Sequence, residues 1–509
     1  MKKNNMVMAV GGLDCSGGAG ITVDYETIHD MGAYALTIAT AVTAQNNSGV
    51  ISINPVDDQV FCDQVRAVDH LKPAVIKTGL LTRCYQIDVL SDYIKRNDGV
   101  QLIIDPVMMS GSGWSLVGEA VVDHMMNELA PLAYLITPNL DEAKKMLTRL
   151  KKGEPEQMDT QKINNDHLFE STIELGRHLK KHFSSTNILL KGGHGDHFQA
   201  LDIFFDKTRI IGFNGAVFNK NPRGTGCRLA SAIAAKMARN QALTEAITIA
   251  KWHIHHLFST AETIVDGRHR MRDERRENDK DPLPEIINFS ACRPIICDRG
   301  FREMDRHIGF YPIVDSHIWV KRLAAWGVKT IQLRMKDMTM DVIEAEIKRS
   351  VDIARENGVA LFINDYWRLA IKYQAYGVHL GQEDLELADL VQISSAGLRL
   401  GISTHNYYEL ARALSLKPSY VALGPVFATT TKNMPYGIQG VARLVEWKQL
   451  CQQLPLVAIG GINETNMERV WQSGVDGVAV ISLVTKASNP CRVVQYAISC
   501  DPEVAIDDA

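Results

Sequence analysis

The segment Pro222-Arg223-Gly224-Thr225-Gly226-Cys227 precedes an alanine-rich stretch, residues 228–235, with strong helix propensity. Glycines that lead directly into a helix expose its first backbone N–H groups, which together with the helix dipole form an anion-binding site. Cys227 would stand at the helix start, where a thiol pKa is lowered. The segment predicts a phosphate cradle beside a reactive group. The alternative is a glycine turn before a core helix that carries a buried cysteine.

Length and composition restrict the class of protein. A chain of 509 residues is too long for one hydrophobic core, so we expect several domains. The formal net charge of −4 argues against nucleic acid or an anionic membrane as the main partner. The nine cysteines show no paired spacing, which favours a reducing compartment. The N-terminal apolar run is too short for a signal peptide, and no run spans a membrane, so we expect a cytoplasmic protein.

Residues 1–265 form the first expected domain. Apolar strand candidates alternate with helical segments, which predicts a mostly parallel sheet covered on both faces. The strand candidates are residues 7–10, 39–44, 74–78, 102–105, 134–137 and 188–191. The glycine-rich loop over residues 11–20 does not have the dinucleotide-binding spacing, but it lets the backbone approach a small ligand. In such sheets, ligands bind beyond the carboxyl ends of the strands.

Polar residues follow those strands. Gln45 could pair with a heteroaromatic ring, and Asp105 ends another strand. Asp105 with Asn139 beside a phosphate cradle could hold Mg²⁺. Asn139 has a second interpretation, a helix cap completed by Glu142 in a capping box. Lys191 ends a further strand and offers a cation that could reach the phosphates of ATP.

The first domain resembles the hydroxymethylpyrimidine/phosphomethylpyrimidine kinases, which are ribokinase-like enzymes of thiamine biosynthesis. The motifs that carry the resemblance occur in order along the chain: Gly12-x-Asp14-x-Ser16-Gly17-Gly18-Ala19-Gly20-Ile21-x-x-Asp24, Ala44-Gln45-Asn46, Asp105-Pro106-Val107-Met108, Pro138-Asn139-x-x-Glu142, Lys191-Gly192-Gly193-His194 and Gly224-Thr225-Gly226-Cys227.

This resemblance implies roles for particular residues of the first domain. Cys227 would activate the substrate hydroxyl or phosphate, and the pyrimidine pocket would be lined by Gly12, Asp24, Gln45 and Val107. ATP and its phosphates would be bound by Asp105, Asn139, Glu142, Lys191, Gly224, Thr225 and Gly226. The sequence departs from the family pattern at Leu80, around Trp114 and at Arg223, which affects contacts of a lid more than the chemistry.

Residues 266–294 form the expected linker. Residues 268–281 contain eleven charged residues in fourteen, and prolines follow at positions 282 and 284. Such a run cannot bury a core, so it predicts a solvated connector. The interleaved acids argue against a basic nucleic-acid patch.

Residues 295–509 form the second expected domain. Eight short strand candidates, each followed by a helical or looped segment, predict a (β/α)₈ TIM barrel with its active site at the C-terminal ends of the strands. The strand candidates are residues 311–314, 330–335, 360–364, 377–380, 398–402, 420–424, 456–459 and 477–481. The fold class is therefore α/β, a ribokinase-like parallel-sheet sandwich followed by a TIM barrel.

Anion-binding groups fall at the ends of those strands. Gln332, Arg334 and Lys336 are two apart, so a single strand would project all three into the barrel lumen. The alternative is that residues 331, 333 and 335 make the core contact. Carboxylates follow the next strands and suggest bridging Mg²⁺. Hydroxyl and ammonium groups follow at 403–405 and 429–432, and Gly460-Gly461 and Ile481-Ser482 end strands where barrels bind a phosphate monoester.

These motifs resemble thiamine-phosphate synthase. They are Gln332-x-Arg334-x-Lys336, Asn364-Asp365-Tyr366, Gly377-Val378-His379-Leu380-Gly381-Gln382-Glu383-Asp384, Gly401-x-Ser403-x-His405, Gly424-Pro425-Val426-Phe427 with Thr429-x-Thr431-Lys432, and Ala458-Ile459-Gly460-Gly461-Ile462.

The resemblance to the synthases implies two phosphorylated substrates. The pyrimidine diphosphate would be held by Gln332, Arg334, Lys336, Asn364, Ser403 and Lys432, with Mg²⁺ on Asp365 and Asp384. The thiazole phosphate would be held by Thr429, Thr431, Gly460, Gly461, Ile481 and Ser482. Arg334, Lys336 and Lys432 would stabilise the departing pyrophosphate, and the thiazole nitrogen would capture the resulting pyrimidine-methyl cation.

We therefore expect a bifunctional enzyme that uses MgATP to phosphorylate hydroxymethylpyrimidine twice and then couples the diphosphate to thiazole phosphate. Two alternatives for the first domain remain, a pyridoxal-type kinase and a non-catalytic pyrimidine-binding module. The expected partners are these small molecules, without nucleic acid or membrane. The sequence leaves the oligomeric state open, a homo-oligomer included.

Overall fold

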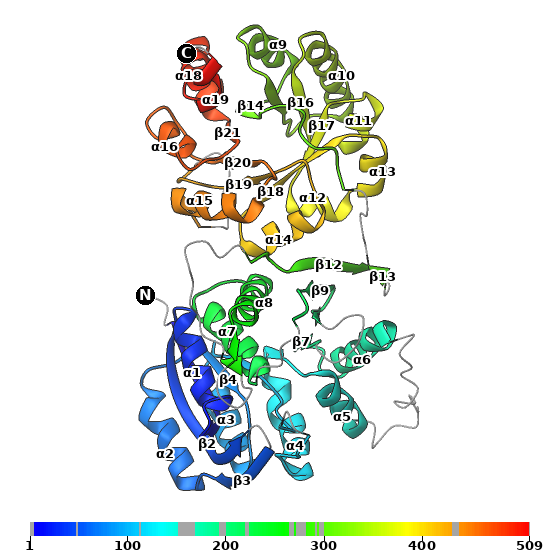
Figure 1. The fold of residues 1–509 in the computed structure, drawn as a ribbon. Helices are drawn as coiled ribbons and strands as arrows, with labels where there is room; N and C mark the ends of the chain where they lie inside the picture. The colour runs from blue at the N-terminus through cyan, green and yellow to red at the C-terminus, as the bar shows by residue number, and fades with distance from the viewer. Residues whose placement is uncertain are drawn as a thin grey trace. The chain divides into compact units, whose positions relative to one another are not determined.

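The computed structural model describes residues 5–46, 49–110, 113–150, 168–192, 200–218, 223–263, 269–270, 281–290, 293–294, 300–429 and 437–507. The chain divides into two compact units, Met1–Ile295 and Ile296–Ala509. Figure 1 shows the ribbon with its elements labelled. Among the described helices, none is long and apolar enough to cross a membrane.

The first unit is built on an eleven-stranded sheet with the order β13-β12-β9-β8-β7-β6-β5-β4-β1-β2-β3. Its strands are β1 (Met6–Asp14), β2 (Tyr34–Asn46), β3 (Gly49–Pro55), β4 (Val75–Thr78), β5 (Gln101–Ile104), β6 (Leu135–Ile136), β7 (Asn187–Leu190), β8 (Leu201–Phe205), β9 (Ile210–Asn214), β12 (Glu285–Ser290) and β13 (Arg293–Pro294). The central strands β2, β1, β4, β5, β6 and β7 are parallel, so their carboxyl ends share one edge. β10 (Glu262–Thr263) and β11 (His269–Arg270) form a separate pair.

Helices cover both faces of this sheet, as the alternation of strands and helices predicts. They are α1 (Gly20–Asp30), α2 (Asp58–Asp69), α3 (Cys84–Arg96), α4 (Glu119–His124), the π-helical turn η1 (Met125–Leu129), the 3₁₀ turn η2 (Ala130–Leu132), α5 (Leu140–Leu150), α6 (Leu168–His182), α7 (Thr225–Ala238) and α8 (Leu243–Ser259). One core joins the inner strands to α2–α6, while α1 and α7 pack against β1 and α8 packs on α7 (Figure 1). The site region at the start of α7 is therefore held by a helix buried along most of its length.

Part of the expected linker belongs to this sheet. Residues 285–290 form β12, which pairs antiparallel with β9, from Glu285 opposite Asn214 to Phe289 opposite Ile210. The expected linker, residues 266–294, was therefore drawn too long at its end, because a run of Ile, Ile and Phe after the prolines supplies a strand of the sheet. Most of the charged run before it lies outside the described residues.

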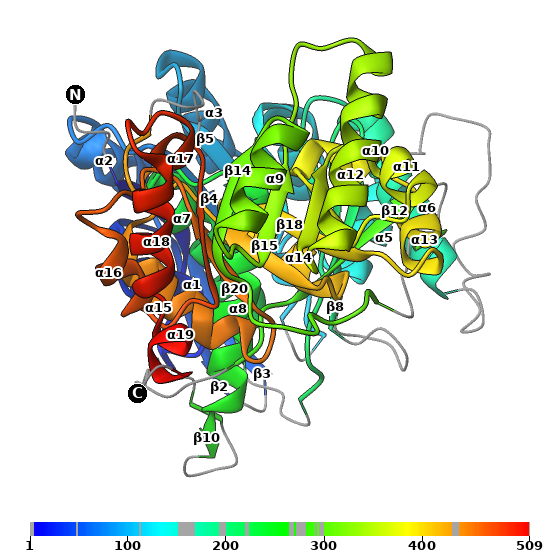
Figure 2. The same cartoon turned by 90° about the horizontal axis from the view of Figure 1, so that it is seen from above.

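The second unit is a closed barrel of eight parallel strands in sequence order. The strands are β14 (Gly309–Val314), β15 (Thr330–Leu333), β16 (Ala360–Asn364), β17 (Gly377–Leu380), β18 (Arg399–Thr404), β19 (Tyr420–Leu423), β20 (Leu456–Ile459) and β21 (Gly477–Val480). The helices are α9 (His317–Ala325), α10 (Met340–Glu356), α11 (Trp367–Lys372), α12 (Gln382–Leu387), α13 (Leu390–Ser395), α14 (Tyr407–Ser415), α15 (Gly440–Cys451), α16 (Met467–Trp471), α17 (Ser482–Thr485), α18 (Pro490–Ser499) and α19 (Pro502–Asp507). Figure 2 shows helices such as α9, α10 and α18 outside the ring of strands.

Aromatic side chains fill the barrel lumen. Tyr311, Phe362 and Tyr420 pack edge to face, with ring centroids 5.1–6.0 Å apart. Gly401 gives Tyr420 its room, since a Cβ at position 401 would lie 2.1 Å from the Tyr420 ring. The lumen is a packed core, so the open part of the barrel is its C-terminal mouth.

Candidate active sites

The glycine loop before α7 forms the turn that the sequence predicts. Gly224 is the N-cap residue of α7 with φ +76°, a left-handed conformation that side chains disfavour. A Cβ on Gly224 would also lie 2.4 Å from the Gly18 carbonyl oxygen, so the two glycine-rich loops touch. The Cβ position of Gly226 lies 3.0 Å from Lys191 Nζ, which brings the loop and that cation together.

Buried charges of alternating sign surround this loop. Lys77 Nζ lies 2.7 Å from Asp24 Oδ1, and both side chains are at most 1% exposed. Lys191 Nζ lies 2.6 Å from Asp105 Oδ1, with side chains 11% and 2% exposed. Each buried cation therefore has a carboxylate partner, which the low-dielectric interior requires.

Cys227 differs from the expectation for a thiol at a helix start. Burial, together with the nearby carboxylates of Asp105 and Asp24, raises the pKa of the Cys227 thiol to about 11, although Lys77 opposes the shift. The prediction of a lowered pKa was wrong, because desolvation outweighs the helix dipole here. At neutral pH, Cys227 is a neutral donor.

The sequence analysis did not identify Lys77 as a site residue, because it lies near the end of an apolar strand. Burial opposes its charge, but the carboxylates of Asp24 and Asp105 and the Cys227 thiol raise the pKa of Lys77. Ser231 Oγ donates to the same Asp24 oxygen at 2.8 Å, so Oδ1 has two partners. Asp24 Oδ2 is buried and has no hydrogen-bond partner among the described residues.

The other residues expected at the pyrimidine pocket follow neighbouring strands. Asp24 Oδ2 lies 3.9 Å from the Cβ position of Gly11, and the Cβ position of Gly12 lies 3.1 Å from Leu80 Cδ2. Gln45 lies in β2 beside a bulge, and the Val107 amide donates to the Asp105 carbonyl at 2.8 Å. Gln45 and Val107 are both partly buried, so each keeps some exposed surface near the strand ends.

Asn139 and Glu142 form the capping box at the start of α5. The Asn139 amide donates to Glu142 Oε2, and the Glu142 amide donates to Asn139 Oδ1, both at 2.8 Å. Glu142 Oε2 is also 3.8 Å from Lys191 Nζ. Burial raises the pKa of Glu142 to about 7, with Lys191 opposing and Asp105 adding to the shift. The helix-cap interpretation of this pair is confirmed.

The mouth of the barrel carries the second polar cluster. Lys336 Nζ lies 2.8 Å from Asp365 Oδ2, with side chains 49% and 18% exposed. Burial and the neighbouring Asp365 carboxylate raise the pKa of Asp384, whereas Lys336 opposes the shift. Lys336 therefore contacts Asp365 and is close enough to influence the charge of Asp384. Among the described residues, no group of three or more His, Cys, Asp or Glu side chains could hold a metal.

The expected three-residue strand face was only partly right. β15 ends at Leu333, so Gln332 alone lies on the strand and is buried in the lumen. Arg334 and Lys336 lie in the following segment, where Arg334 is partly buried and Lys336 is exposed. The prediction that all three project from one strand was wrong, because the parallel pairing with β14 and β16 stops at Leu333.

A row of hydrogen bonds crosses the lumen. Gln332 Nε2 donates to the Tyr311 hydroxyl at 3.1 Å, and the Tyr311 and Tyr420 hydroxyls lie 2.8 Å apart. His379 Nδ1 lies 2.7 Å from the Tyr420 hydroxyl, and His379 Nε2 lies 2.8 Å from Ser403 Oγ. Burial lowers the pKa of His379 to about 4, with the Asp365 charge opposing.

The remaining synthase residues end the later strands. Gly460 and Gly461 have φ +99° and +68°, and their Cβ positions would lie 2.7 Å from Pro425 and 2.5 Å from the Ala428 carbonyl oxygen. Ile481 and Ser482 follow β21, Thr429 follows the loop after β19, and Asn364 ends β16, opposite His379 in register. Thr431 and Lys432 lie outside the described residues.

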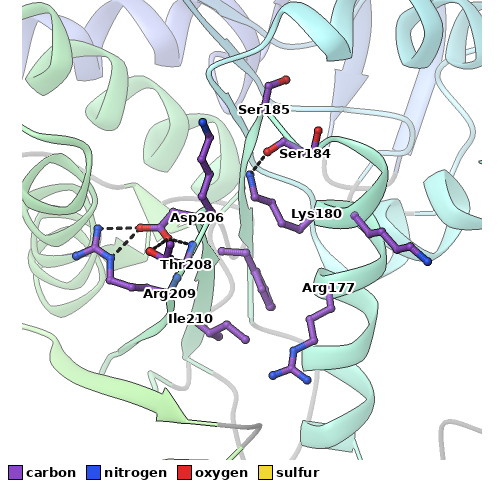
Figure 3. A pocket seen from close by; sticks show the side chains of 11 residues that line it. Arg177, Lys180, Ser184, Ser185, Asp206, Thr208, Arg209 and Ile210 are labelled. Atoms are coloured by element: carbon purple, nitrogen blue, oxygen red, sulfur yellow. Dashed lines mark hydrogen bonds and ion pairs between the residues drawn. The ribbon is translucent and has the colours of Figure 1, made fainter. Parts of the chain in front are cut away.

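A basic pocket of about 660 Å³ lies between the end of α6 and the β8–β9 hairpin. Leu201, at the start of β8, neighbours Gly192 and hence Lys191. The hairpin turn follows the other end of β8, so the pocket lies away from Lys191. In Figure 3, Lys180 points to the Ser184 carbonyl, Arg209 points to Asp206, and Arg177 turns away from both. These cations do not converge on one point, and we assign no ligand to this pocket.

The fold and the sites define the class of protein. The first unit is an α/β domain in which α7 begins at a glycine loop between buried ion pairs, and the second is a TIM barrel with Arg334, Lys336, Asp365 and Asp384 at its mouth. The family model described as phosphomethylpyrimidine kinase matches residues 14–271, and the model described as thiamine monophosphate synthase matches residues 310–484. The chain therefore belongs to the phosphomethylpyrimidine kinase family, and its barrel belongs to the thiamine-phosphate synthases.

Individual proteins are similar to each half of the chain. Thiamine-phosphate synthase of Photorhabdus laumondii is 52% identical over 189 residues, which are 37% of this chain and 88% of that protein. The structure of phosphomethylpyrimidine kinase from Clostridium difficile is 30% identical and covers 49% of this chain and 97% of that chain, with a TM-score of 0.39. The protein is a bifunctional phosphomethylpyrimidine kinase and thiamine-phosphate synthase, with both activities in thiamine biosynthesis.

Proposed function

We propose that the first unit also phosphorylates the free alcohol, hydroxymethylpyrimidine, and that one site performs both phosphoryl transfers. The observation that carries this is the set of compensated charges around the glycine loop, Asp24–Lys77 and Asp105–Lys191. Phosphoryl transfer depends on positioning and charge stabilisation more than on covalent chemistry by the protein. Such a site can therefore accept either an alcohol or a phosphate as the acceptor.

Each residue has a distinct role in this proposal. Asp24 Oδ2, buried and without a partner among the described residues, accepts a hydrogen bond from the pyrimidine. The amides of Gly224, Thr225 and Gly226 bind the transferred phosphoryl group, and Lys191 stabilises its developing charge. Cys227 acts as a neutral donor of the anion hole, since its pKa of about 11 disfavours a role as base.

The magnesium that accompanies ATP fits beside Asp105, with Asn139 and Glu142 close to it. A buried carboxylate next to a phosphate cradle is a favourable donor for this cation, which commonly keeps several waters. When bound, Mg²⁺ neutralises charge on the β- and γ-phosphates. Lys191 would then exchange part of its contact with Asp105 for the γ-phosphate.

In the second unit, Asp365 and Asp384 fit Mg²⁺ bound jointly with the pyrimidine diphosphate. Burial and the nearby Asp365 carboxylate raise the pKa of Asp384, so a bound cation would favour the charged forms of both groups. Arg334, Lys336 and Lys432 stabilise the departing pyrophosphate, with Gln332, Asn364 and Ser403 on the same substrate. Backbone amides near Gly460, Gly461, Ile481 and Ser482, with Thr429 and Thr431, bind the thiazole phosphate.

The test uses the intact chain. Incubation with hydroxymethylpyrimidine, MgATP and thiazole phosphate should give thiamine phosphate, identified by mass. If only the monophosphate of the pyrimidine supports product, the first phosphorylation belongs to another enzyme. Pyridoxal added in excess should compete weakly, and strong competition would favour a pyridoxal-type site.

The seven described cysteines are free thiols, which supports a cytoplasmic location.

A further inference from the structure

Ser403 is the last group in a row of hydrogen bonds that begins on the opposite side of the barrel. The row runs from Gln332 of β15 through Tyr311 of β14 and Tyr420 of β19 to His379 of β17, and ends at Ser403 of β18. Gln332, Tyr311, Tyr420 and His379 are buried, whereas Ser403 is only partly buried. The row therefore links the packed lumen to the mouth.

One arrangement of donors in this row gives every proton an acceptor among these contacts. An amide nitrogen donates and never accepts, so the Tyr311 oxygen accepts from Gln332 Nε2. Each tyrosine hydroxyl has a single proton. In this arrangement the Tyr311 hydroxyl donates to the Tyr420 oxygen, and the Tyr420 hydroxyl donates to His379 Nδ1. With Nδ1 accepting, a neutral His379 carries its proton on Nε2 and donates to Ser403 Oγ.

We propose that this relay fixes Ser403 as a hydrogen-bond donor to the pyrimidine diphosphate, with His379 and the two tyrosines as positioning residues. Because Ser403 Oγ accepts from His379, its own proton is available for an acceptor atom of the substrate. The proposal rests on the proposed function, in which Ser403 contacts this substrate. It adds that Gln332, across the barrel, sets the direction in which the serine hydroxyl points.

Packing holds the members of the relay in place. The His379 ring stacks on Tyr420 with centroids 5.6 Å apart and an interplanar angle of 25°. Tyr311 and Tyr420 pack edge to face at 5.9 Å. The Tyr420 ring fills the space that Gly401 leaves, since a Cβ there would overlap it. Rings fixed in this way hold the relay atoms within hydrogen-bond distance, so the direction of donation is set by the obligate donor at its end, the Gln332 amide.

A reversal of the relay tests its direction without any substrate. In Gln332→Glu, a carboxylate that only accepts would take the Tyr311 proton, and every later bond would reverse. ¹⁵N NMR of the histidine-labelled full chain should show His379 as the Nε2–H tautomer in the wild type and as the Nδ1–H tautomer in the variant. Gln382→Glu is the matched control, because Gln382 lies beside Ser403 but donates to its carbonyl. Its His379 tautomer should be that of the wild type.

An Nδ1–H tautomer in the wild type, or no change in Gln332→Glu, would overturn the relay. The catalytic consequence is tested by a double-mutant cycle. Tyr420→Phe should lower synthase turnover on the order of tenfold, the effect of one lost hydrogen bond, and should add almost nothing in a Ser403→Ala background. Additive losses would overturn the coupling. Full activity of Ser403→Ala with the expected tautomers would instead show that the relay exists and that the proposed substrate contact is wrong.

Discussion

The two active sites of this chain handle charge in opposite ways. Around the glycine loop of the kinase unit, Lys77 and Lys191 are buried and each is in contact with a carboxylate. At the mouth of the synthase barrel, Lys336 is 49% exposed and contacts Asp365, whose carboxylate is near that of Asp384. The lysines of the kinase site are thus buried in ion pairs, whereas the ion pair at the barrel mouth is partly open to solvent.

This difference separates folding from binding. A buried ion pair is costly to form and more costly to break, because the remaining charge stays uncompensated in the interior. An exposed pair contributes little to stability, since water replaces the lost partner. We therefore expect charge removal in the kinase site to affect stability and activity together, and charge removal at the barrel mouth to affect activity almost alone.

The largest effect is expected for Lys191→Met. The change removes a cation proposed to stabilise the transferred phosphoryl group, and kinase turnover should fall by about 10³-fold or more. Lys207→Met is the matched control, since Lys207 lies on the far hairpin in the basic pocket. Coupled assays of ADP release measure the kinase, and the same preparation given pyrimidine diphosphate should retain its synthase rate. Kinase turnover within tenfold of the wild type would contradict the role of Lys191.

Lys77→Met tests whether the buried ion pairs of the kinase site stabilise the folded first unit. The variant leaves Asp24 buried beside Ser231 without its cation, so unfolding of the first unit should become easier by about 3–5 kcal/mol. Lys72→Met removes a lysine from an ion pair whose side chains are 62% and 50% exposed, and it should cost under about 1 kcal/mol. Calorimetry of the full chain measures both, with an ATP analogue used to identify the kinase transition. Equal losses of stability in the two variants would show that the buried Lys77–Asp24 pair stabilises the fold no more than an exposed ion pair does.

Asp365→Asn is the corresponding change at the barrel mouth. Synthase turnover should fall on the order of 10²-fold, because one ligand of the proposed Mg²⁺ becomes neutral. The unfolding free energy of the barrel should change by less than about 1 kcal/mol, since the pair with Lys336 is partly exposed. Asp352→Asn, on an exposed pair of α10, should alter neither quantity. A large loss of barrel stability in Asp365→Asn would show that the mouth is a structural ion pair.

The comparison also explains what the sequence can reveal. Each barrel strand lies within two residues of its predicted position, because buried parallel strands form apolar runs between turns. β8, β9 and β12 were missed, since short antiparallel strands at the end of the sheet have no intervening helices to mark them. The motifs give the candidate site residues, but not which of them are buried.

Burial explains why the sequence did not predict the properties of Cys227, Lys77 and His379. The pKa of Cys227 depends on Asp24 and Asp105, which are distant in sequence, and on desolvation that no local pattern encodes. Lys77 gave one usable signal, a lysine at the end of an apolar strand, where an interior cation needs a partner. His379 lies inside a motif identified from the sequence, but its link to Tyr420 requires the closed barrel.

Glu142 is the exception within the compensated site and gives the smallest of these effects. Its pKa of about 7 in the folded chain lies above the value near 4.5 of a free glutamate, so the folded state binds the proton more tightly. The stability that this group contributes is complete below about pH 4.5 and is lost as the pH rises through 7. Thermal unfolding of the kinase unit at pH 5, 6, 7 and 8 should therefore show a decline of about 1–2 kcal/mol that Glu142→Gln removes. Asp141→Asn, at the exposed neighbouring position, should keep the decline, and an unchanged decline in Glu142→Gln would mean that Lys191 compensates Glu142 as fully as it does Asp105.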